Sequence, residues 1–510
     1  MAKGYIIGFS SGMFMTADSK EKEDFLTMPR KFFKGAIEGV NFTQVDIESV
    51  TEFKEPFLKE GMKRMKDLGL RLGFHGESYA MGGVEKPIGM LDSCIEMHYI
   101  HAHERLIEHI EGCGKLGGEF VNIHPSETTP FIKLGRDLQP AKLVDPWGRT
   151  FDVFLKENKK ILEWAIEAAD KDIITATHLR RYARVFYEHL RDEAMAAKKE
   201  ITEESRKQFK REAWKLALLE FVNSNDLEYG AEKIAYFIVA KWMQENRDPL
   251  WKDIVGKHIP DKKLIEKHKE WVPAVSSKYI WGHFNPRDPR YKDPKPLLKK
   301  YKIYFVFESQ MGSTGLEGLY RLTRPRDMAF LCKSIGSKYV SVCFDFEHVL
   351  SQNINPIDEI KSMPYGLASY IKVCHLGWPT PHVPAHMPIP VGSEAQIYLY
   401  ERLYELRKKG MEFAYFIFER AAAGRGSTII ALRLIKHFLE RDVPPKKLPF
   451  RFFGMDERGP DIKRQEMAVT EHFFDPLKGM LVVPEEEYTF LSSVATKKGK
   501  AEVWKKEKYR

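Results

Sequence analysis

The sequence predicts an α/β protein built on a closed, parallel, eight-stranded (β/α)8 barrel. Eight short apolar runs alternate with segments of helical spacing, which is typical of a parallel sheet. Removing one long helical segment and a C-terminal extension leaves about 285 residues, close to the roughly 250 of such barrels. We therefore expect a barrel with a large, mostly α-helical insertion after the fourth strand and a C-terminal extension.

The first half of the predicted barrel contains strands at residues 4–9, 43–47, 70–74 and 119–123. Helices are expected at 31–38, 57–68 and 91–109, and Gly69 is a suitable C-cap for the second of these. The helix at 91–109 carries His98, His101, His103 and His109. We interpret these four histidines as part of a solvated helix face.

The alternation stops between residues 150 and 297 and then resumes. Helices are expected at 151–169, 179–199, 203–222 and 231–246, the last with an apolar stripe through Ile234, Phe237 and Trp242. Further strands are expected at 304–307, 339–344, 369–374 and 412–418, with helices at 325–335, 394–408 and 427–439. This predicts a first half-barrel at 1–149, an insertion at 150–297, a second half-barrel at 298–440 and an extension with a basic tail at 441–510.

Composition excludes several classes of protein. Five cysteines without paired spacing argue against a disulfide scaffold and favour a reducing compartment. The sequence has neither an 18-residue apolar run nor a signal-peptide pattern, so we expect a cytoplasmic protein without a membrane partner. The formal charge of +9, spread over 510 residues, permits a polyanionic partner without requiring one.

Charged and imidazole side chains stand at the ends of the last six predicted strands. They are His75, His124, Glu308, Asp345, His375 and Glu419, with His348 and His386 in the following loops. In a closed barrel these strand ends meet at one mouth. Three carboxylates and several imidazoles buried together require cations, and this ligand set suits Zn²⁺, with Mn²⁺ or Fe also possible. There are more ligands than one ion needs, so we expect two or three ions.

A cluster of ions has a specific chemical use. Two or three cations can bind phosphate oxygens, activate a water and stabilise a leaving alkoxide, which is phosphodiester hydrolysis. We expect Glu308, Glu419 and Asp345 to be catalytic, with Glu308 or Glu419 bridging two ions. The sequence shows no convincing Ser-His-Asp or P-loop pattern.

The same residues resemble endonuclease IV, within the superfamily of xylose-isomerase-like TIM barrels. The matching motifs are FHGESY at His75, NIHPS at His124, FESQMGSTG at Glu308, Asp-x-x-His at Asp345 and His348, CHLG at His375, AHMPIPVG at His386 and IFER at Glu419. The resemblance covers residues 1–149 and 298–440, and it implies zinc and incision of DNA at abasic or damaged sites. DNA or another phosphodiester is the partner that it implies.

The sequence departs from the family at three places. Tyr79 stands one residue later than usual, Pro384 replaces an Asp for which His382 could substitute, and the insertion has no counterpart. Two alternatives stay open. Glu308, Asp345, His375 and Glu419 also fit the single-ion quartet of a sugar isomerase or epimerase, in which two carboxylates transfer protons. A hydrolase of another substrate, or a binding protein whose insertion recruits a partner, is the third hypothesis.

Overall fold

The computed structural model describes residues 4–11, 32, 36, 39–47, 49–54, 58–77, 88–126, 142–171, 177–223, 231–264, 266–311, 321–377, 387–419 and 425–455. The helix expected at 31–38 falls almost wholly outside these residues, as do most of the C-terminal extension and its basic tail. None of the described helices is long and apolar enough to cross a bilayer.

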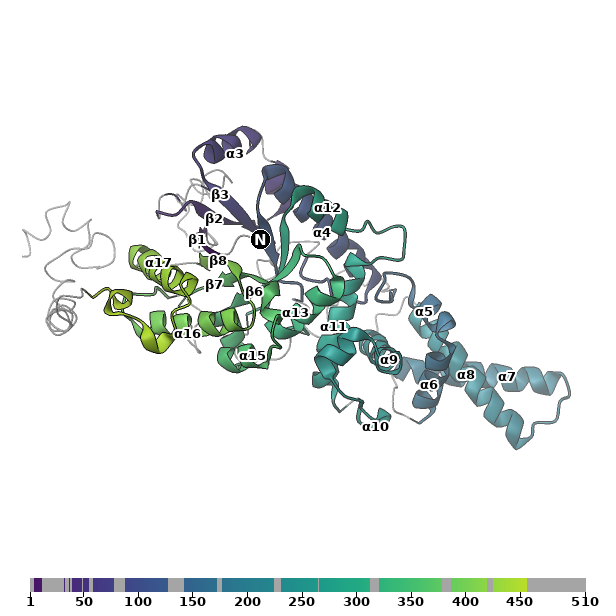
Figure 1. The fold of residues 1–510 in the computed structure, drawn as a ribbon. Helices are drawn as coiled ribbons and strands as arrows, with labels where there is room; N and C mark the ends of the chain where they lie inside the picture. The colour runs from purple at the N-terminus through teal and green to yellow at the C-terminus, as the bar shows by residue number, and fades with distance from the viewer. Residues whose placement is uncertain are drawn as a thin grey trace, which may run out of the picture. The chain divides into compact units, whose positions relative to one another are not determined.

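Eight parallel strands close into a barrel, which confirms the predicted fold class (Figure 1). The strands are β1 (Gly4–Ser10), β2 (Phe42–Asp46), β3 (Arg71–His75), β4 (Phe120–Ile123), β5 (Tyr304–Glu308), β6 (Val340–Asp345), β7 (Ile371–His375) and β8 (Phe413–Phe418). Each strand pairs with the next, and β8 pairs with β1 from Gly4↔Phe413 to Phe9↔Phe418. Consecutive strands therefore all present their carboxyl ends at one mouth.

The inward-facing side chains explain how polar residues reach that mouth. The centre of the barrel is filled by Phe42, Phe120, Val306, Cys343, Val373, Tyr415 and Ile417. Side chains two residues apart on a strand share a face. Glu308, Asp345 and His375 each stand two residues beyond one of these core residues. The alternation that fills the barrel therefore also directs these three side chains to the mouth.

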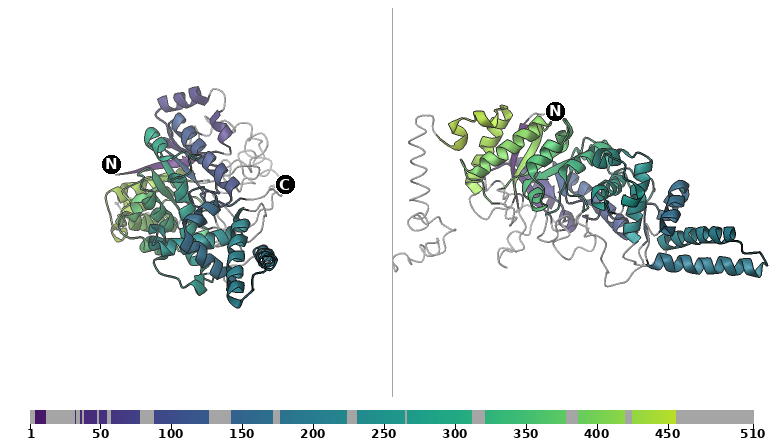
Figure 2. Two further views of the ribbon diagram at one scale, coloured as in Figure 1. Left: turned by 90° about the vertical axis from the view of Figure 1, so that its right-hand side faces the viewer. Right: turned by 90° about the horizontal axis from the view of Figure 1, so that it is seen from below.

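The helices between β4 and β5 confirm the predicted insertion after strand four. They are α5 (Phe151–Glu157), α6 (Lys159–Asp170), α7 (Thr177–Ala196), α8 (Glu203–Asn223), α9 (Ala231–Glu245), α10 (Asp261–Leu264), α11 (His268–Phe284) and α12 (Lys295–Tyr301), with a π-helical turn η3 (Trp251–Val255). Helices α7 and α8 run side by side (Figure 2). The exact domain boundaries at 150 and 297 stay predictions.

One helix expected at 151–169 is in fact two. Asn158 has φ −107° and ψ 61°, so the helical backbone is interrupted there. Its side-chain amide donates to Phe154 O at 2.8 Å, and its Oδ1 accepts from Trp242 Nε1 at 3.0 Å. Asparagine competes for backbone hydrogen bonds in this way, which the apolar periodicity alone does not reveal.

The remaining helices lie between the other strands or after the last one. They are α3 (Leu58–Asp67), α4 (Glu96–Leu116), α13 (Pro325–Ile335), α14 (Phe346–Ser351), α15 (Pro356–Ser362), α16 (Glu394–Lys408) and α17 (Arg425–Glu440), with the short turns η1 (Val50–Lys54), η4 (Leu367–Tyr370), η5 (Pro445–Lys447) and η6 (Phe450–Phe453). Helix α4 extends beyond the predicted end at residue 109. It stops where Gly117 adopts a left-handed φ of 67° and donates to Cys113 O and Gly114 O.

The chain forms two compact units. The first comprises Met1–Met387 and Glu405–Arg420, which include the whole barrel and the insertion. The second comprises Pro388–Tyr404 and Ala421–Arg510. Within the described part of the second unit, Tyr400 OH donates to Val443 O at 2.6 Å and the Tyr400 ring packs on Phe452, with centroids 5.0 Å apart.

The interpretation of the α4 histidines as a solvated face is wrong for His103 and His109, which are buried. His103 Nε2 lies 3.0 Å from Lys292 O, so this nitrogen carries the proton and donates. His103 Nδ1 then accepts from His283 Nδ1 at 3.2 Å. The pair joins α4 of the barrel to α11 of the insertion. The spacing of residues within 91–109 could not reveal this contact, because the partner lies in another part of the sequence.

This histidine pair predicts acid sensitivity. Burial lowers the pKa of His103 to about 4, and burial also lowers that of His283. The pKa of a histidine is about 6.5 in the unfolded chain, so His103 takes up a proton more readily there than in the folded protein. The folded protein therefore has its full free energy of unfolding above about pH 6.5, and that free energy decreases as the pH falls toward 4. We expect His103 alone to account for a loss on the order of 3 kcal/mol over that window. Urea unfolding at pH 7 and pH 4.5 measures this loss. The variant His103→Gln should be less stable than the wild type at pH 7, but its free energy of unfolding should change less between the two pH values.

Candidate metal centre

The structure brings seven of the eight predicted site residues together at the barrel mouth. His75, Glu308, Asp345 and His375 end β3, β5, β6 and β7, while His124 and Glu419 directly follow β4 and β8. His348 lies in α14. All seven side chains are buried. His386, like Tyr79, His382 and Pro384, lies outside the described residues.

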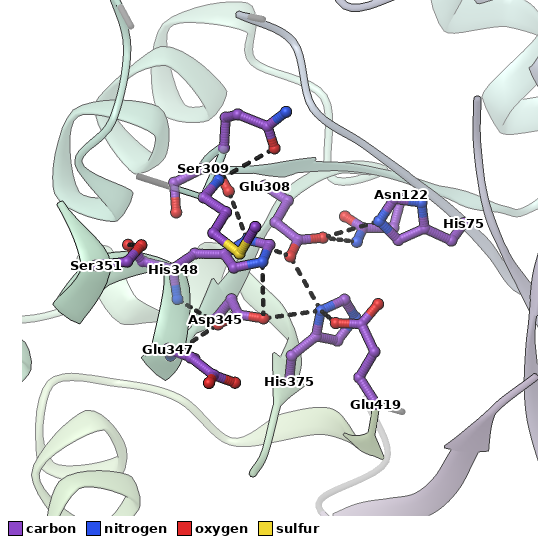
Figure 3. Close-up of polar contacts among 12 residues, drawn as sticks. His75, Asn122, Glu308, Ser309, Asp345, Glu347, His348, Ser351, His375 and Glu419 are labelled. Atoms are coloured by element: carbon purple, nitrogen blue, oxygen red, sulfur yellow. Dashed lines mark hydrogen bonds and ion pairs between the residues drawn. The ribbon is translucent and has the colours of Figure 1, made fainter. Parts of the chain in front are cut away.

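Three carboxylates converge on one nitrogen, His375 Nδ1 (Figure 3). Its distances are 3.0 Å to Glu308 Oε1, 3.1 Å to Glu419 Oε2 and 3.3 Å to Asp345 Oδ2. These residues come from four consecutive strands, β5 to β8. Four donor atoms from Glu308, Asp345, His375 and Glu419 lie within 4.8 Å of one another, which is the spacing that ligands of one cation have.

Asp345 is oriented by the helix that follows it. Its Oδ1 accepts hydrogen bonds from the backbone N–H groups of Glu347, at 2.8 Å, and His348, at 2.7 Å. Asp345 is thus the N-cap of α14. Because Oδ1 is engaged in the cap, Oδ2 is the atom that faces His375.

Glu308 is the most connected carboxylate of the centre. Its Oε1 lies 3.1 Å from His348 Nδ1 in addition to His375, and its Oε2 lies 3.3 Å from His75 Nε2. Its Oε2 also accepts a hydrogen bond from Asn122 Nδ2. His348 Nδ1 donates to Ser309 O at 2.9 Å as well, which fixes the ring of His348 beside Glu308.

His75, His124 and Glu308 form a second group with donor atoms within 4.8 Å of one another. The rings of His75 and His124 have centroids 5.1 Å apart. His75 Nδ1 donates to Gly76 O at 3.0 Å, so its Nε2 is the nitrogen that faces Glu308. Among the described residues, His124 Nδ1 has no hydrogen-bond partner although it is buried. This second group therefore offers two imidazoles and shares its one carboxylate with the first.

The pKa values show that the centre has a strongly negative potential. Burial lowers the pKa of a histidine, yet the carboxylate of Glu308 outweighs it and raises the pKa of His75 to about 9. At His348 the carboxylates of Asp345 and Glu308 outweigh burial and raise the pKa to about 10. The pKa of His375 is raised for a similar reason. His124 differs, because burial dominates and lowers its pKa to about 3. Such a potential favours a divalent cation.

The donor chemistry of the first group fits a divalent ion. Three carboxylates and one imidazole suit Mn²⁺, Mg²⁺ or Zn²⁺, since oxygen-rich sites select the harder ions. A further group combines Glu308, Cys343 and His375. Burial raises the pKa of the Cys343 thiol far above its ordinary value, so this residue is a neutral core side chain.

The structure adds two site residues that the sequence analysis missed, Gln44 on β2 and Asn122 on β4. Gln44 Oε1 accepts from His375 Nε2 at 3.0 Å, and Asn122 donates to Glu308. Each stands two residues before another polar mouth residue, Asp46 and His124 respectively. That period of two places both side chains on the inward face of the barrel, but it does not show which residues they contact.

Comparisons with known proteins give structural matches only. No protein-family model and no curated protein sequence matches this chain. An L-ribulose 3-epimerase matches with 10% identity and a TM-score of 0.40 over 89% of this chain and 100% of its own. A D-psicose 3-epimerase in the presence of D-fructose matches with 11% identity and a TM-score of 0.39, over 86% and 97%. A xylose isomerase-like TIM barrel protein from Mycobacterium smegmatis in complex with magnesium matches with 10% identity and a TM-score of 0.36, over 87% and 98%.

These comparisons correct the predicted function. The structures that match are sugar epimerases and a magnesium-binding barrel, and the prediction of an endonuclease IV-like hydrolase with roles in DNA binding and DNA repair is wrong. The physical reason is that carboxylates and imidazoles at strand ends specify a metal site, whereas the reaction depends on what else lines the mouth. The fold that the coarser resemblance implies, a TIM barrel, is the one that the structure has.

Proposed function

We propose that this protein is a single-ion isomerase or epimerase that moves a proton at the carbon next to a carbonyl of a sugar-like substrate. One observation carries the proposal. His375 Nδ1 lies within 3.0 to 3.3 Å of one oxygen each from Glu308, Asp345 and Glu419, so four donors surround one point. The ion that we propose there is Mn²⁺, with Zn²⁺ or Mg²⁺ as other occupants.

The two glutamates have the roles of acid and base. They reach the centre from different strands, β5 and β8, so they approach a substrate from different directions. One carboxylate removes the proton from the substrate C–H bond, and the electron pair becomes the double bond of an enediolate. The other carboxylate, or the same one, returns a proton to carbon. A divalent ion, when bound, supplies the positive charge that stabilises the negative oxygen next to the reacting carbon.

His75 and His124 bind substrate in this proposal. Each imidazole has a nitrogen within 4.8 Å of an oxygen of Glu308. His75 lies beside Oε2, on the side of the carboxylate away from Asp345 and Glu419 (Figure 3). Burial keeps His124 neutral, because its pKa is lowered to about 3. A neutral imidazole can donate to or accept from a hydroxyl group, which is the functional group that a polyhydroxylated substrate offers.

The test combines ion analysis with hydrogen exchange. We expect one divalent ion per chain in protein loaded with Mn²⁺, as measured by elemental analysis. With a panel of ketoses in D₂O, we expect deuterium at the carbon next to the carbonyl, as measured by NMR, and no incorporation with Glu419→Gln. Two or more tightly bound ions, or one ion without exchange in any member of the panel, would contradict the proposal. Glu167→Gln, at a side chain that is 60% exposed on α6, is the control for the substitution itself.

A further inference from the structure

We propose that Gln44 and Asn122 are positioning residues that preset the ligand atoms of the metal centre, Gln44 by fixing the tautomer of His375 and Asn122 by fixing the rotation of Glu308. The inference deepens the proposed function, because it concerns the same centre. It rests on two buried carboxamides, on β2 and β4, each of which forms a hydrogen bond with a predicted ligand.

Gln44 determines which nitrogen of His375 faces the carboxylates. The oxygen of Gln44, Oε1, lies 3.0 Å from His375 Nε2 and can only accept, so Nε2 carries a proton. In the neutral ring the lone pair is then on Nδ1, the atom that Glu308, Asp345 and Glu419 surround. Metal-ligating histidines are oriented in this way by a partner on the opposite nitrogen.

Asn122 determines which oxygen of Glu308 faces His375. Asn122 Nδ2 donates to Oε2, and His75 Nε2 lies 3.3 Å from that same oxygen. Oε1 is left to face His375 Nδ1 at 3.0 Å. A carboxylate held by one oxygen cannot rotate freely, so its second oxygen stays in the position of a ligand.

A role in stability alone does not account for these two amides. Both side chains have 0% exposure, and Gln44 Nε2 and Asn122 Oδ1 have no hydrogen-bond partner among the described residues. A buried, unpaired amide atom destabilises a fold by about 1–3 kcal/mol. Other inward-facing positions of the barrel hold apolar side chains such as Val306, Val373 and Ile417. Apolar residues at 44 and 122 would pack without that cost, so the amides serve the centre.

The test separates tautomer control from packing. Gln44→Met keeps the length of the side chain but removes the acceptor, and we expect Mn²⁺ affinity to fall by about 10–100-fold. Gln44→Glu keeps an acceptor oxygen and should retain or raise the affinity. Gln396→Met is the matched control. Gln396 is equally buried and hydrogen-bonded, to Gly392 N and Phe452 O, but it lies in the second unit, so its replacement should lower the melting temperature without changing Mn²⁺ affinity.

A second readout does not depend on the ion. In metal-free protein with ¹⁵N-labelled histidine, we expect one ring to show a hydrogen-bonded, slowly exchanging Nε2–H in the wild type and in Gln44→Glu, and to lose that signal in Gln44→Met. Unchanged affinity and an unchanged Nε2–H signal in Gln44→Met would overturn the proposal, as would equal losses in Gln44→Met and Gln44→Glu. If Gln44→Met does not fold, Asn122→Leu takes its place, with the same expected loss of affinity. A wild-type chain that binds no ion but shows this hydrogen-bonded Nε2–H contradicts the proposed function and leaves the orientation of His375 by Gln44 intact.

Discussion

Glu308→Gln should remove the divalent ion and lower turnover by about 10²–10⁴-fold while the barrel stays folded. Glu308 places one oxygen 3.0 Å from His375 Nδ1 and the other 3.3 Å from His75 Nε2. An amide at this position loses the negative charge, and its NH₂ group must face either an imidazole or the Asn122 donor. The centre then has two carboxylates in place of three, and its affinity for a cation falls accordingly.

The measurements are the bound ion by elemental analysis, the initial rate of deuterium exchange, and the melting temperature. Glu359→Gln is the matched control, because Glu359 is also a buried glutamate. It is held by Arg324 Nη2 at 2.6 Å and by the Arg326 N–H at 2.9 Å, with no contact to the centre among those that we describe. We expect Glu359→Gln to melt earlier but to bind the ion normally. A Glu308→Gln protein with full ion content and an undiminished rate would refute the role of Glu308.

The strand-end ligands could be predicted because burial makes charged residues conspicuous. Asp345 and His375 each end an apolar run that fills the barrel, and a charge in such a place is unfavourable unless it is paired. The period of two then carries the side chain to the mouth. The closure of the barrel followed from counting eight such runs, since pairing between β1 and β8 leaves no unpaired edge.

The same reasoning could not identify Gln44 and Asn122 as site residues. A single neutral polar residue inside a strand is unremarkable, and its meaning depends on a partner elsewhere in the chain. Gln44 and His375 are separated by 331 positions. The stagger of the strands decides whether they meet, and the sequence of one strand does not contain that information.

The same limit explains the error at His103. Within α4 its spacing resembles that of the other histidines, and its burial comes from His283, which lies 180 positions further along. The predicted ligands also left the reaction undecided. Four ligands of one ion are compatible with hydrolysis as well as with proton transfer, so the residues that surround the ion, not its ligands, distinguish the two.

The helices of the insertion contact the loops of the barrel mouth through Asp92. Ser126, two residues after His124, donates to Asp92 Oδ2 at 2.6 Å, and Ser276 of α11 donates to the same oxygen at 3.1 Å. Tyr236 of α9 donates to the carbonyl oxygen of Asp92. Arg321, which precedes α13, lies with its Nη1 3.5 Å from that carbonyl and forms an ion pair with Glu232 of α9 at 2.9 Å. Segments that follow β3, β4 and β5 are thus joined to two helices of the insertion.

Arg321→Met should therefore destabilise the protein by about 3–5 kcal/mol, because it leaves the carboxylate of Glu232 without its buried partner. The side chains of Arg321 and Glu232 are only 2% and 12% exposed, so water cannot replace the lost charge. The guanidinium also lies 4.6 Å from the centre of the Tyr236 ring, a cation–π contact that methionine does not reproduce. Thermal unfolding measures the loss, and limited proteolysis between residues 150 and 297 reports whether the insertion loosens first.

Two further variants distinguish loss of the buried ion pair from a nonspecific effect of replacing an arginine. Arg184→Met removes an ion pair with Glu188 on α7, where the arginine side chain is 81% exposed, and it should cost no more than about 1 kcal/mol. Combining Arg321→Met with Glu232→Leu removes both buried charges and should recover part of the lost stability, since two apolar side chains need no partner. If Arg321→Met melts at the wild-type temperature, or if the double variant is less stable than either single one, the ion pair does not hold the insertion to the mouth. If the double variant instead regains the full stability of the wild type, the ion pair adds no net stability, and the loss in Arg321→Met comes only from the unpaired charge of Glu232.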